Sequence, residues 1–306
     1  MKLLKSIFIL LPFIGIVLGD KSGKIVGGNT AVRGQFPYHV FIDVFDGQST
    51  HICGGALIRF NYVLTSAICI RNSLDINLIF GKINRHEGSI SARFHITKRE
   101  HIIIHPEFNS TTYANDLALL YLEGSETLLQ DPYVDIIPLP TEEDYQEEVV
   151  GLRGNVTGFG LISDDPPRLA TELKYIQLPI ISNVNCLQTY GNSISWEDKF
   201  CLDGTEGSTC IGDEGAPFVV YLNGRDILGG IGSIALTNCT IGLPTIFINL
   251  LPHLDWIDDN TSQPPDTVPP PQPDDRCNCV CRCYTCPAPS AESTNKNIFK
   301  KRWLEN

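Results

Sequence analysis

The sequence has little positive charge and, after its first 18 residues, no long hydrophobic run. Its 306 residues include 23 Lys and Arg against 35 Asp and Glu, which gives a formal net charge of −12. A chain this acidic lacks the cationic field that attracts nucleic acids and anionic membranes, unless a local patch supplies it, and we expect neither as a partner. No later segment approaches the roughly 20 apolar residues needed to cross a bilayer. Because 42% of the residues are hydrophobic, the chain can bury a sizeable core, and general disorder is excluded.

The N-terminus predicts export from the cell. Lys2 and Lys5 precede an apolar run over residues 7–18, and Val17 and Gly19 suit signal peptidase. We predict a signal peptide over residues 1–19 and a secreted, extracellular protein; the run is too short to favour the alternative, a membrane anchor. In a secreted protein, N-x-[ST] sequons are candidate sites of N-glycosylation. Four are present, and they begin at Asn109, Asn155, Asn238 and Asn260.

Cysteine is abundant and unevenly placed. Six of the 11 cysteines lie between Cys53 and Cys239, and an odd total leaves at least one thiol unpaired within the chain in an oxidising compartment. The other five crowd into one short segment. An interchain disulfide to a partner is our first hypothesis for this segment, ahead of soft-metal binding by thiolates and of a locally knotted tail. Its thiols are Cys277, Cys279, Cys281, Cys283 and Cys286.

The body of the chain predicts an all-β fold. Short alternating runs such as residues 38–45, 94–98 and 218–222 are bounded by Gly, Asn and Pro, which is typical of an antiparallel barrel or sandwich. Only residues 250–257 show helical spacing. Beyond the body, which ends at residue 260, we expect a proline-rich linker over residues 261–276 and a cysteine-rich, basic tail over residues 277–306.

The body resembles the secreted trypsin- and chymotrypsin-like serine proteases, particularly those of arthropods. The resemblance covers residues 25–260 and implies two six-stranded antiparallel barrels with a site in the cleft between them. It also implies that residues 20–24 are a short activation propeptide. The motifs that carry it are Ile25-Val-Gly-Gly28, Gly34-Gln-Phe-Pro-Tyr38, Cys53-Gly-Gly-Ala-Leu-Ile58, Val63-Leu-Thr-Ser-Ala-Ile-Cys69, Asn115-Asp-Leu-Ala-Leu-Leu120, Cys210-Ile-Gly-Asp-Glu-Gly-Ala-Pro217 and Leu254-Asp-Trp-Ile257.

Two of the three catalytic roles of that family are vacant here. Its chemistry needs an attacking hydroxyl, an imidazole base and a buried carboxylate that orients the base. The position of the imidazole holds Ile68, and the position of the serine holds Glu214. Only the carboxylate, Asp116, remains. His51 and Ser66 are nearby in sequence, but the resemblance places His51 on a strand flanking the cleft.

Glu214 is expected to block the site as well as to leave it without a nucleophile. In the family, the backbone N–H groups at the positions of Gly212 and Glu214 bind the developing oxyanion. A carboxylate on Glu214 would occupy these donors and repel a negatively charged transition state. We therefore predict a degenerate site, no cofactor and no metal, and a protein that is not an enzyme.

The activation machinery, in contrast, looks complete. Cleavage after Lys24 would free the amine of Ile25, which the resemblance pairs with Asp213 in a buried ion pair. The alternative is that Ile25 and Asp213 are inherited parts of the scaffold and that cleavage after Lys24 has no function. The resemblance also implies a pocket with Ser208 at its floor and Ala235 and Gly242 at its walls, and the disulfides Cys53–Cys69, Cys186–Cys201 and Cys210–Cys239.

The sequence therefore favours a secreted, inactive serine protease homologue that binds an extracellular protease, zymogen or substrate. An immune or a reproductive secretion is the setting that the resemblance suggests. Two alternatives stay open: a serine-type endopeptidase with residual or unconventional activity, and a disulfide-linked adaptor that acts through the cysteine-rich tail.

Overall fold

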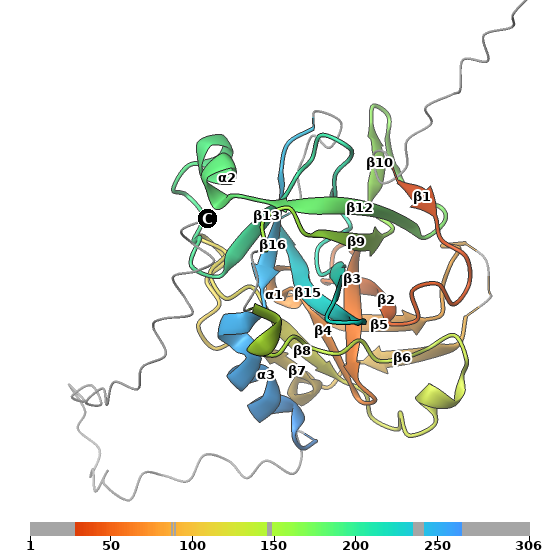
Figure 1. Ribbon diagram of the computed structural model, residues 1–306. Helices are drawn as coiled ribbons and strands as arrows, with labels where there is room; N and C mark the ends of the chain where they lie inside the picture. The colour runs from red at the N-terminus through yellow and green to blue at the C-terminus, as the bar shows by residue number, and fades with distance from the viewer. Residues whose placement is uncertain (1–27, 87, 89, 146–148, 235–241, 265–306) are drawn as a thin grey trace, which may run out of the picture.

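The alternating runs in the first half of the chain form one curled antiparallel sheet (Figure 1). The computed structural model describes residues 28–86, 88, 90–145, 149–234 and 242–264. The strands of this first sheet are ordered β6-β5-β2-β3-β4-β8-β7. Their bounds are β2 (His39–Phe45), β3 (Thr50–Arg59), β4 (Tyr62–Thr65), β5 (Asp75–Phe80), β6 (Ala92–Ile96), β7 (Ile102–Ile104) and β8 (Ala118–Tyr121).

The second half of the chain forms a sheet that closes on itself. Its order is β1-β12-β13-β16-β15-β14-β9, and an additional pairing of β12 with β9 completes a six-stranded barrel, with β1 added at the edge. A hairpin of β10 (Leu161–Asp164) and β11 (Pro167–Leu169) stands apart. The strand bounds are β1 (Asn29–Thr30), β9 (Arg153–Gly158), β12 (Lys174–Ile181), β13 (Lys199–Leu202), β14 (Pro217–Leu222), β15 (Arg225–Ile234) and β16 (Thr245–Asn249).

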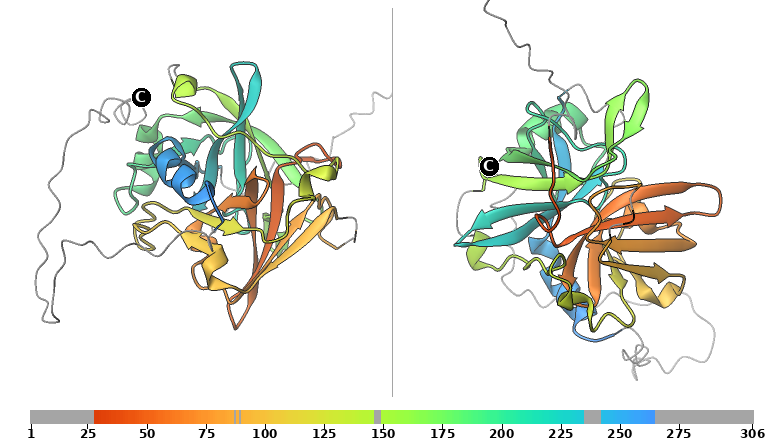
Figure 2. Two further views of the ribbon diagram at one scale, coloured as in Figure 1. Left: turned by 90° about the horizontal axis from the view of Figure 1, so that it is seen from below. Right: turned by 90° about the vertical axis from the view of Figure 1, so that its right-hand side faces the viewer.

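The predicted all-β, chymotrypsin-like architecture is confirmed, with one refinement: the first sheet is a half-barrel and the second is closed. Figure 2 shows the two sheets as separate groups of strands, orange and green to blue, that lie against each other. The apolar cluster between them joins Leu64 and Leu119 of the first sheet to Leu228 and Ile231 of the second. Burial on this scale is the main stabilising contribution to such a domain.

The C-terminal helix returns to pack on this same cluster. A 3₁₀ turn, η5 (Leu251–His253), leads into α3 (Leu254–Thr261), and Ile257 is fully buried among the residues of both sheets. The helix predicted at residues 250–257 is therefore present, displaced by a few residues. Among the helices of the described residues, none is long and apolar enough to cross a membrane.

The expectation of a single helix was wrong. The structure also has α1 (Ala67–Ile70) and α2 (Asn183–Tyr190), besides the 3₁₀ turns η1 (Arg99–His101), η2 (Leu128–Gln130) and η3 (Glu143–Tyr145). Helix α2 leaves Val184 and Leu187 exposed, so it has no apolar stripe for a periodicity argument to find. It is fixed instead by an N-cap, in which Ser182 Oγ accepts the Val184 N–H at 3.3 Å, and by a disulfide through Cys186.

Candidate active site

The two barrels meet at a close backbone contact beside Glu214. The Gly54 N–H on β3 donates to the Glu214 carbonyl oxygen at 2.8 Å. Gly215 follows with a φ of +77°, and a Cβ there would lie only 2.2 Å from the Gly54 carbonyl oxygen. This contact leaves room for glycine alone and fixes the backbone that carries the Glu214 side chain.

Asp116 lies two residues before β8 begins and is fully buried. Its Oδ1 accepts the backbone N–H of Ile68 at 2.7 Å, and its Oδ2 accepts the hydroxyl of Ser233 at 2.7 Å. Burial raises the pKa of Asp116 to about 7, against the lowering effect of these two hydrogen bonds. The carboxylate thus contacts Ile68, which the resemblance places at the position of the family's histidine, and both of its hydrogen-bond donors are neutral.

No imidazole stands at the position of the base. Ile68 is partly exposed on α1, one residue before Cys69. The nearest histidine in the sequence, His51, has its Nε2 2.9 Å from the Cys69 carbonyl oxygen, so Nε2 carries the proton and donates it there. Ser66 is buried, and its hydroxyl has no hydrogen-bond partner among the described residues.

The Glu214 side chain folds back onto the loop that precedes it. The Gly212 N–H donates to Glu214 Oε2 at 2.7 Å, and the Glu214 backbone N–H also stabilises the carboxylate. Burial raises the pKa of Glu214, while these two donors and the nearby His51 oppose the rise. The carboxylate therefore contacts both N–H groups that the resemblance assigns to the oxyanion hole.

Asp213, the expected partner of the freed N-terminus, has different hydrogen-bond partners from those of Glu214. Its two carboxylate oxygens accept the N–H groups of Gly160 at 2.8 Å and Cys210 at 3.0 Å. Burial raises the pKa of Asp213 to about 7, and the charge of Glu214 adds to this effect. Lys24 and Ile25 lie outside the described residues, so the pairing stays a prediction.

The expected pocket residues are only partly described. Ser208 is buried, Gly242 is partly exposed with a φ of +70°, and Ala235 lies outside the described residues. The disulfides Cys53–Cys69 and Cys186–Cys201 are present, each with Cα atoms 6.4 Å apart. Cys210 is also disulfide-bonded, and its expected partner Cys239 is outside the described residues, as are the tail thiols. Disulfides of this kind are consistent with an extracellular protein.

One cluster resembles a metal site only in its composition. His51, Cys53 and Cys69 bring their side-chain ligand atoms within 4.8 Å of one another. Because the two cysteines form a disulfide, they supply no thiolate to a metal.

Three of the four sequons can be placed. Asn109 is exposed in a loop and accepts the N–H groups of Thr111 and Thr112. Asn155 is partly exposed on β9, while the Asn260 amide donates to the Trp256 carbonyl oxygen at 2.7 Å. Asn238 is outside the described residues. Glycosylation at these positions stays a prediction.

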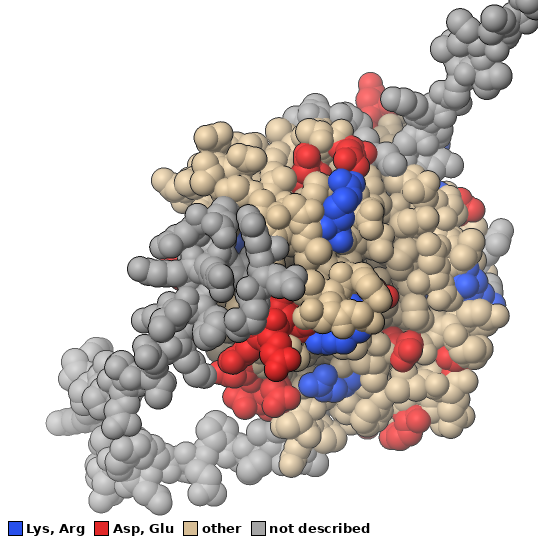
Figure 3. Space-filling view, viewed as in Figure 1, with Lys and Arg blue, Asp and Glu red and all other residues tan. Residues whose placement is uncertain are grey.

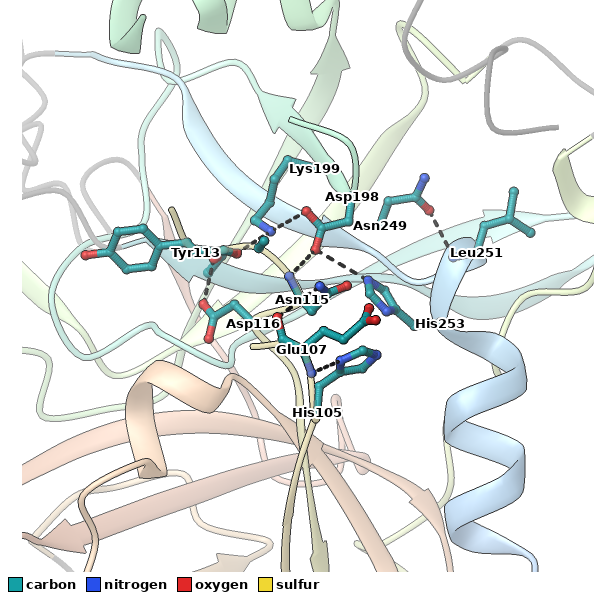
Figure 4. Close-up of polar contacts among 12 residues, drawn as sticks. His105, Glu107, Tyr113, Asn115, Asp116, Asp198, Lys199, Asn249, Leu251 and His253 are labelled. Carbon is teal, nitrogen blue, oxygen red and sulfur yellow. Dashed lines mark hydrogen bonds and ion pairs between the residues drawn. The ribbon is translucent and has the colours of Figure 1, made fainter. Parts of the chain in front are cut away.

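A buried polar network beside Asp116 was not expected from the sequence (Figure 4). Lys199, which is fully buried, donates to Asp198 Oδ1 at 2.7 Å and to the Tyr113 carbonyl oxygen at 2.8 Å. Asp198 Oδ2 accepts the Asn115 N–H at 2.8 Å and lies 3.4 Å from Nε2 of His253. The only signal in the sequence is a pair of adjacent opposite charges, Asp198-Lys199, at the start of an apolar strand.

This network holds the loop that leads into Asp116. Tyr113 and Asn115 have φ values of 56° and 51°, a left-handed conformation that costs free energy for residues other than glycine. Both make backbone hydrogen bonds to the Asp198–Lys199 pair. The pair thereby joins this loop to the second barrel and, through His253, to the C-terminal helix.

The surface beside this helix is strongly acidic. Asp255, Asp258 and Asp259 of α3 are exposed, and Figure 3 shows acidic side chains gathered on this face. Arg59 is their near neighbour, 3.5 Å from Asp258. Such a face repels anions and is open to a basic protein partner.

The comparisons with known proteins agree with this architecture. The family model described as Trypsin matches residues 25–257. A collagenase of Hypoderma lineatum is 31% identical over 244 residues, which cover 79% of this chain and 88% of the relative. Trypsin-1 of Astacus astacus is 31% identical, with 77% of this chain and 99% of the relative covered.

A solved structure, that of HL collagenase, has a TM-score of 0.66 and 30% identity over 77% of this chain and 98% of its own. Ile68 and Glu214 lie within the span that the family model matches. The chain belongs to the trypsin family of chymotrypsin-like serine protease domains.

Proposed function

We propose that this chain is a secreted, catalytically inactive member of the trypsin family that acts by binding another extracellular protein. The observation that carries the proposal is the contact between the Glu214 carboxylate and the Gly212 N–H at 2.7 Å. A negative charge occupies the donors that would have to stabilise an oxyanion, and it does so at the position of the attacking serine. The partner class is a protease, a zymogen or a substrate of extracellular proteolysis.

The size of the catalytic defect supports this proposal. In a serine protease, loss of the serine or the histidine alone lowers turnover by about 10⁶, which corresponds to about 8 kcal/mol of activation free energy. Because the triad acts as a unit, loss of both costs little more. Asp116 keeps its place without the imidazole that it would orient.

The names of the relatives favour the alternative, an active endopeptidase. Relatives such as Serine protease 1 of Drosophila melanogaster, 30% identical over 250 residues, are named as proteases. For this chain, such an activity would need a base and a nucleophile from other residues. His51 donates its Nε2 proton to the Cys69 carbonyl oxygen, and Glu214 is held by backbone donors. Neither arrangement provides a base that activates a hydroxyl.

Restoring the family's residues tests the proposal. We expect the purified wild-type chain, cleaved after Lys24, to resist labelling by a serine-directed fluorophosphonate. The double variant Ile68→His/Glu214→Ser is expected to be labelled, because the Asp116 carboxylate is already in contact with residue 68. The matched control is Ile68→His/Glu214→Ala, which frees the same N–H groups but has no hydroxyl at position 214. Labelling of the wild type at a rate similar to that of the double variant would overturn the proposal.

The binding role is tested separately. Affinity capture from the native secretion, with the full chain and a chain ending at residue 260 compared side by side, should recover the same partner with both. Capture by the full chain alone would favour the adaptor that acts through its cysteine-rich tail.

A further inference from the structure

The half-barrel has an open seam, and a groove lies in it. Among the described residues, β6 pairs only with β5, while β7 pairs with β8 on the far side of the sheet. Residues 97–101 connect the two strands through the η1 turn. The wedge between β6 and the end of β8 has a volume of about 460 Å³ and is lined by residues 93–98, His101 and residues 121–123. We call it the seam groove.

Basic side chains gather along this groove in a chain whose net charge is −12, and the acidic Glu123 lines it as well. Residues 93–101 contain one acidic side chain, Glu100, and five basic ones. The basic side chains are Arg93, His95, Lys98, Arg99 and His101. The Arg93 guanidinium is exposed and makes no hydrogen bond or ion pair within the described part of the chain, although Asp43 is near enough to interact with its charge.

Lys98 and His95, two other basic residues that line the groove, contact acidic side chains near the surface. Lys98 Nζ lies 2.7 Å from Glu123, and His95 Nε2 lies 2.7 Å from Asp75. Exposed pairs of this kind contribute little to stability, so a multivalent anion can compete for the cations.

A buried imidazole at the end of the wedge lacks a partner. His101 is only 4% exposed, and its Nε2 has no hydrogen-bond partner among the described residues. Its ring packs edge-on against Tyr121, with ring centroids 5.0 Å apart. A buried nitrogen without a hydrogen bond is destabilising, and a ligand oxygen that reaches it recovers this loss.

We propose that the seam groove binds a linear sulfated polysaccharide. Arg93 and His95 are two residues apart on one face of β6, so these two basic side chains are about 7 Å apart along a straight line, a spacing that suits a linear polyanion. The groove offers few apolar contacts for peptide side chains: Ile96 and Leu122 are buried in the core, and Phe94 is partly buried. Recognition by charge and hydrogen bonds favours a sulfated sugar over an acidic peptide.

Heparin binding by the full chain tests the proposal, with desulfated heparin and polyglutamate as comparison ligands. We expect the wild type to bind heparin at low ionic strength and to bind the other two at least about tenfold more weakly. The variant Arg93→Glu/Lys98→Glu should weaken heparin binding by about tenfold or more, and His101→Leu by about threefold with an unchanged unfolding midpoint. If His101→Leu does not fold, His101→Gln serves in its place.

Two matched variants exclude a general effect of charge. Arg59→Glu/Arg153→Glu makes the same change in net charge at exposed arginines outside the groove and should leave the heparin Kd within about twofold. Lys300→Ala/Lys301→Ala/Arg302→Ala removes the basic residues near the end of the tail and should also leave the heparin Kd within about twofold. Equal losses in the groove variant and in either control would overturn the proposal, as would polyglutamate binding as tight as that of heparin.

Discussion

Asp116 and Asp198 are two neighbouring buried carboxylates whose pKa values are shifted in opposite directions. Asp116 accepts hydrogen bonds only from neutral donors, Ile68 N–H and the Ser233 hydroxyl, and burial raises its pKa to about 7. Burial acts on Asp198 in the same direction, but His253 and Lys199 outweigh it and lower the pKa to about 2.

The difference shows how a buried carboxylate behaves with and without a cation in hydrogen-bond contact. Burial raises the pKa of Asp116 to about 7, and neither of its hydrogen-bond donors is a cation, so at neutral pH it is close to the midpoint of its titration. Asp198 has its cations and remains charged, and its charge organises the left-handed loop at Tyr113 and Asn115. Asp116 can take up a proton in its surroundings, whereas loss of the cations beside Asp198 would leave a buried charge uncompensated.

The largest expected effect comes from removing the cation beside Asp198. Lys199→Met should lower the free energy of unfolding by about 3–5 kcal/mol, because Asp198 would stay buried without its ion-pair partner. Urea unfolding measures this change. Lys174→Met is the matched control: Lys174 is equally buried, but its partner Glu172 is 46% exposed and stays hydrated, so the loss should be clearly smaller. Equal losses would contradict the account.

The next effect concerns the pH dependence of stability. The folded-state pKa of Asp116 is about 7, above the unfolded value of about 3.9, so the folded protein retains the proton between these values. Its contribution to stability is complete below about pH 4 and is lost as the pH rises through about 7. Asp116→Asn keeps an acceptor for the Ile68 N–H and removes the charge. It should therefore raise the free energy of unfolding at pH 8 by about 2 kcal/mol and change it little at pH 5.

Asp213 has the same direction of shift, so the slope of stability against pH in Asp116→Asn should decrease without vanishing. Urea titrations between pH 4 and 8 measure it. A variant that is less stable than the wild type at pH 8 would show that the charge on Asp116 is favourable.

The smallest effect belongs to His253. Its imidazole helps to lower the pKa of Asp198, so His253→Leu should raise that pKa. The stability that ionised Asp198 contributes is present above about pH 4 and is lost as the pH falls through about 2, so the acid-unfolding midpoint of the variant should move to higher pH. The loss at pH 5 should be about 1 kcal/mol. His86→Leu removes an exposed histidine and should leave the acid midpoint unchanged.

Much of this structure was predictable from local patterns. The alternating runs indicated β-strands, and three of the expected strands, near residues 38–45, 94–98 and 218–222, differ from the observed ones by one or two residues. Alternation alone does not give the order of the strands in a sheet, on which barrel closure depends. The two barrels were expected only from the resemblance that the ordered motifs carry.

Other features depend on contacts between distant parts of the chain. Helix α2 has no apolar stripe, and its cap and its disulfide through Cys186 hold it in place. The Asp198–Lys199 pair looks like ordinary surface charge until β13 buries it against residues 113–115. The contact between Glu214 and Gly212 was expected near the oxyanion donors, but its length and direction depend on the glycine turn at Gly215.

Hydrolysis of a peptide ester by the purified chain, cleaved after Lys24, measures the central claim most directly. The account predicts a rate equal to that of buffer for the wild type and for Glu214→Ala alike, since neither has a hydroxyl nucleophile beside a base. A wild-type rate that saturates with ester concentration and disappears in Glu214→Ala would contradict it, because the carboxylate would then be taking part in catalysis.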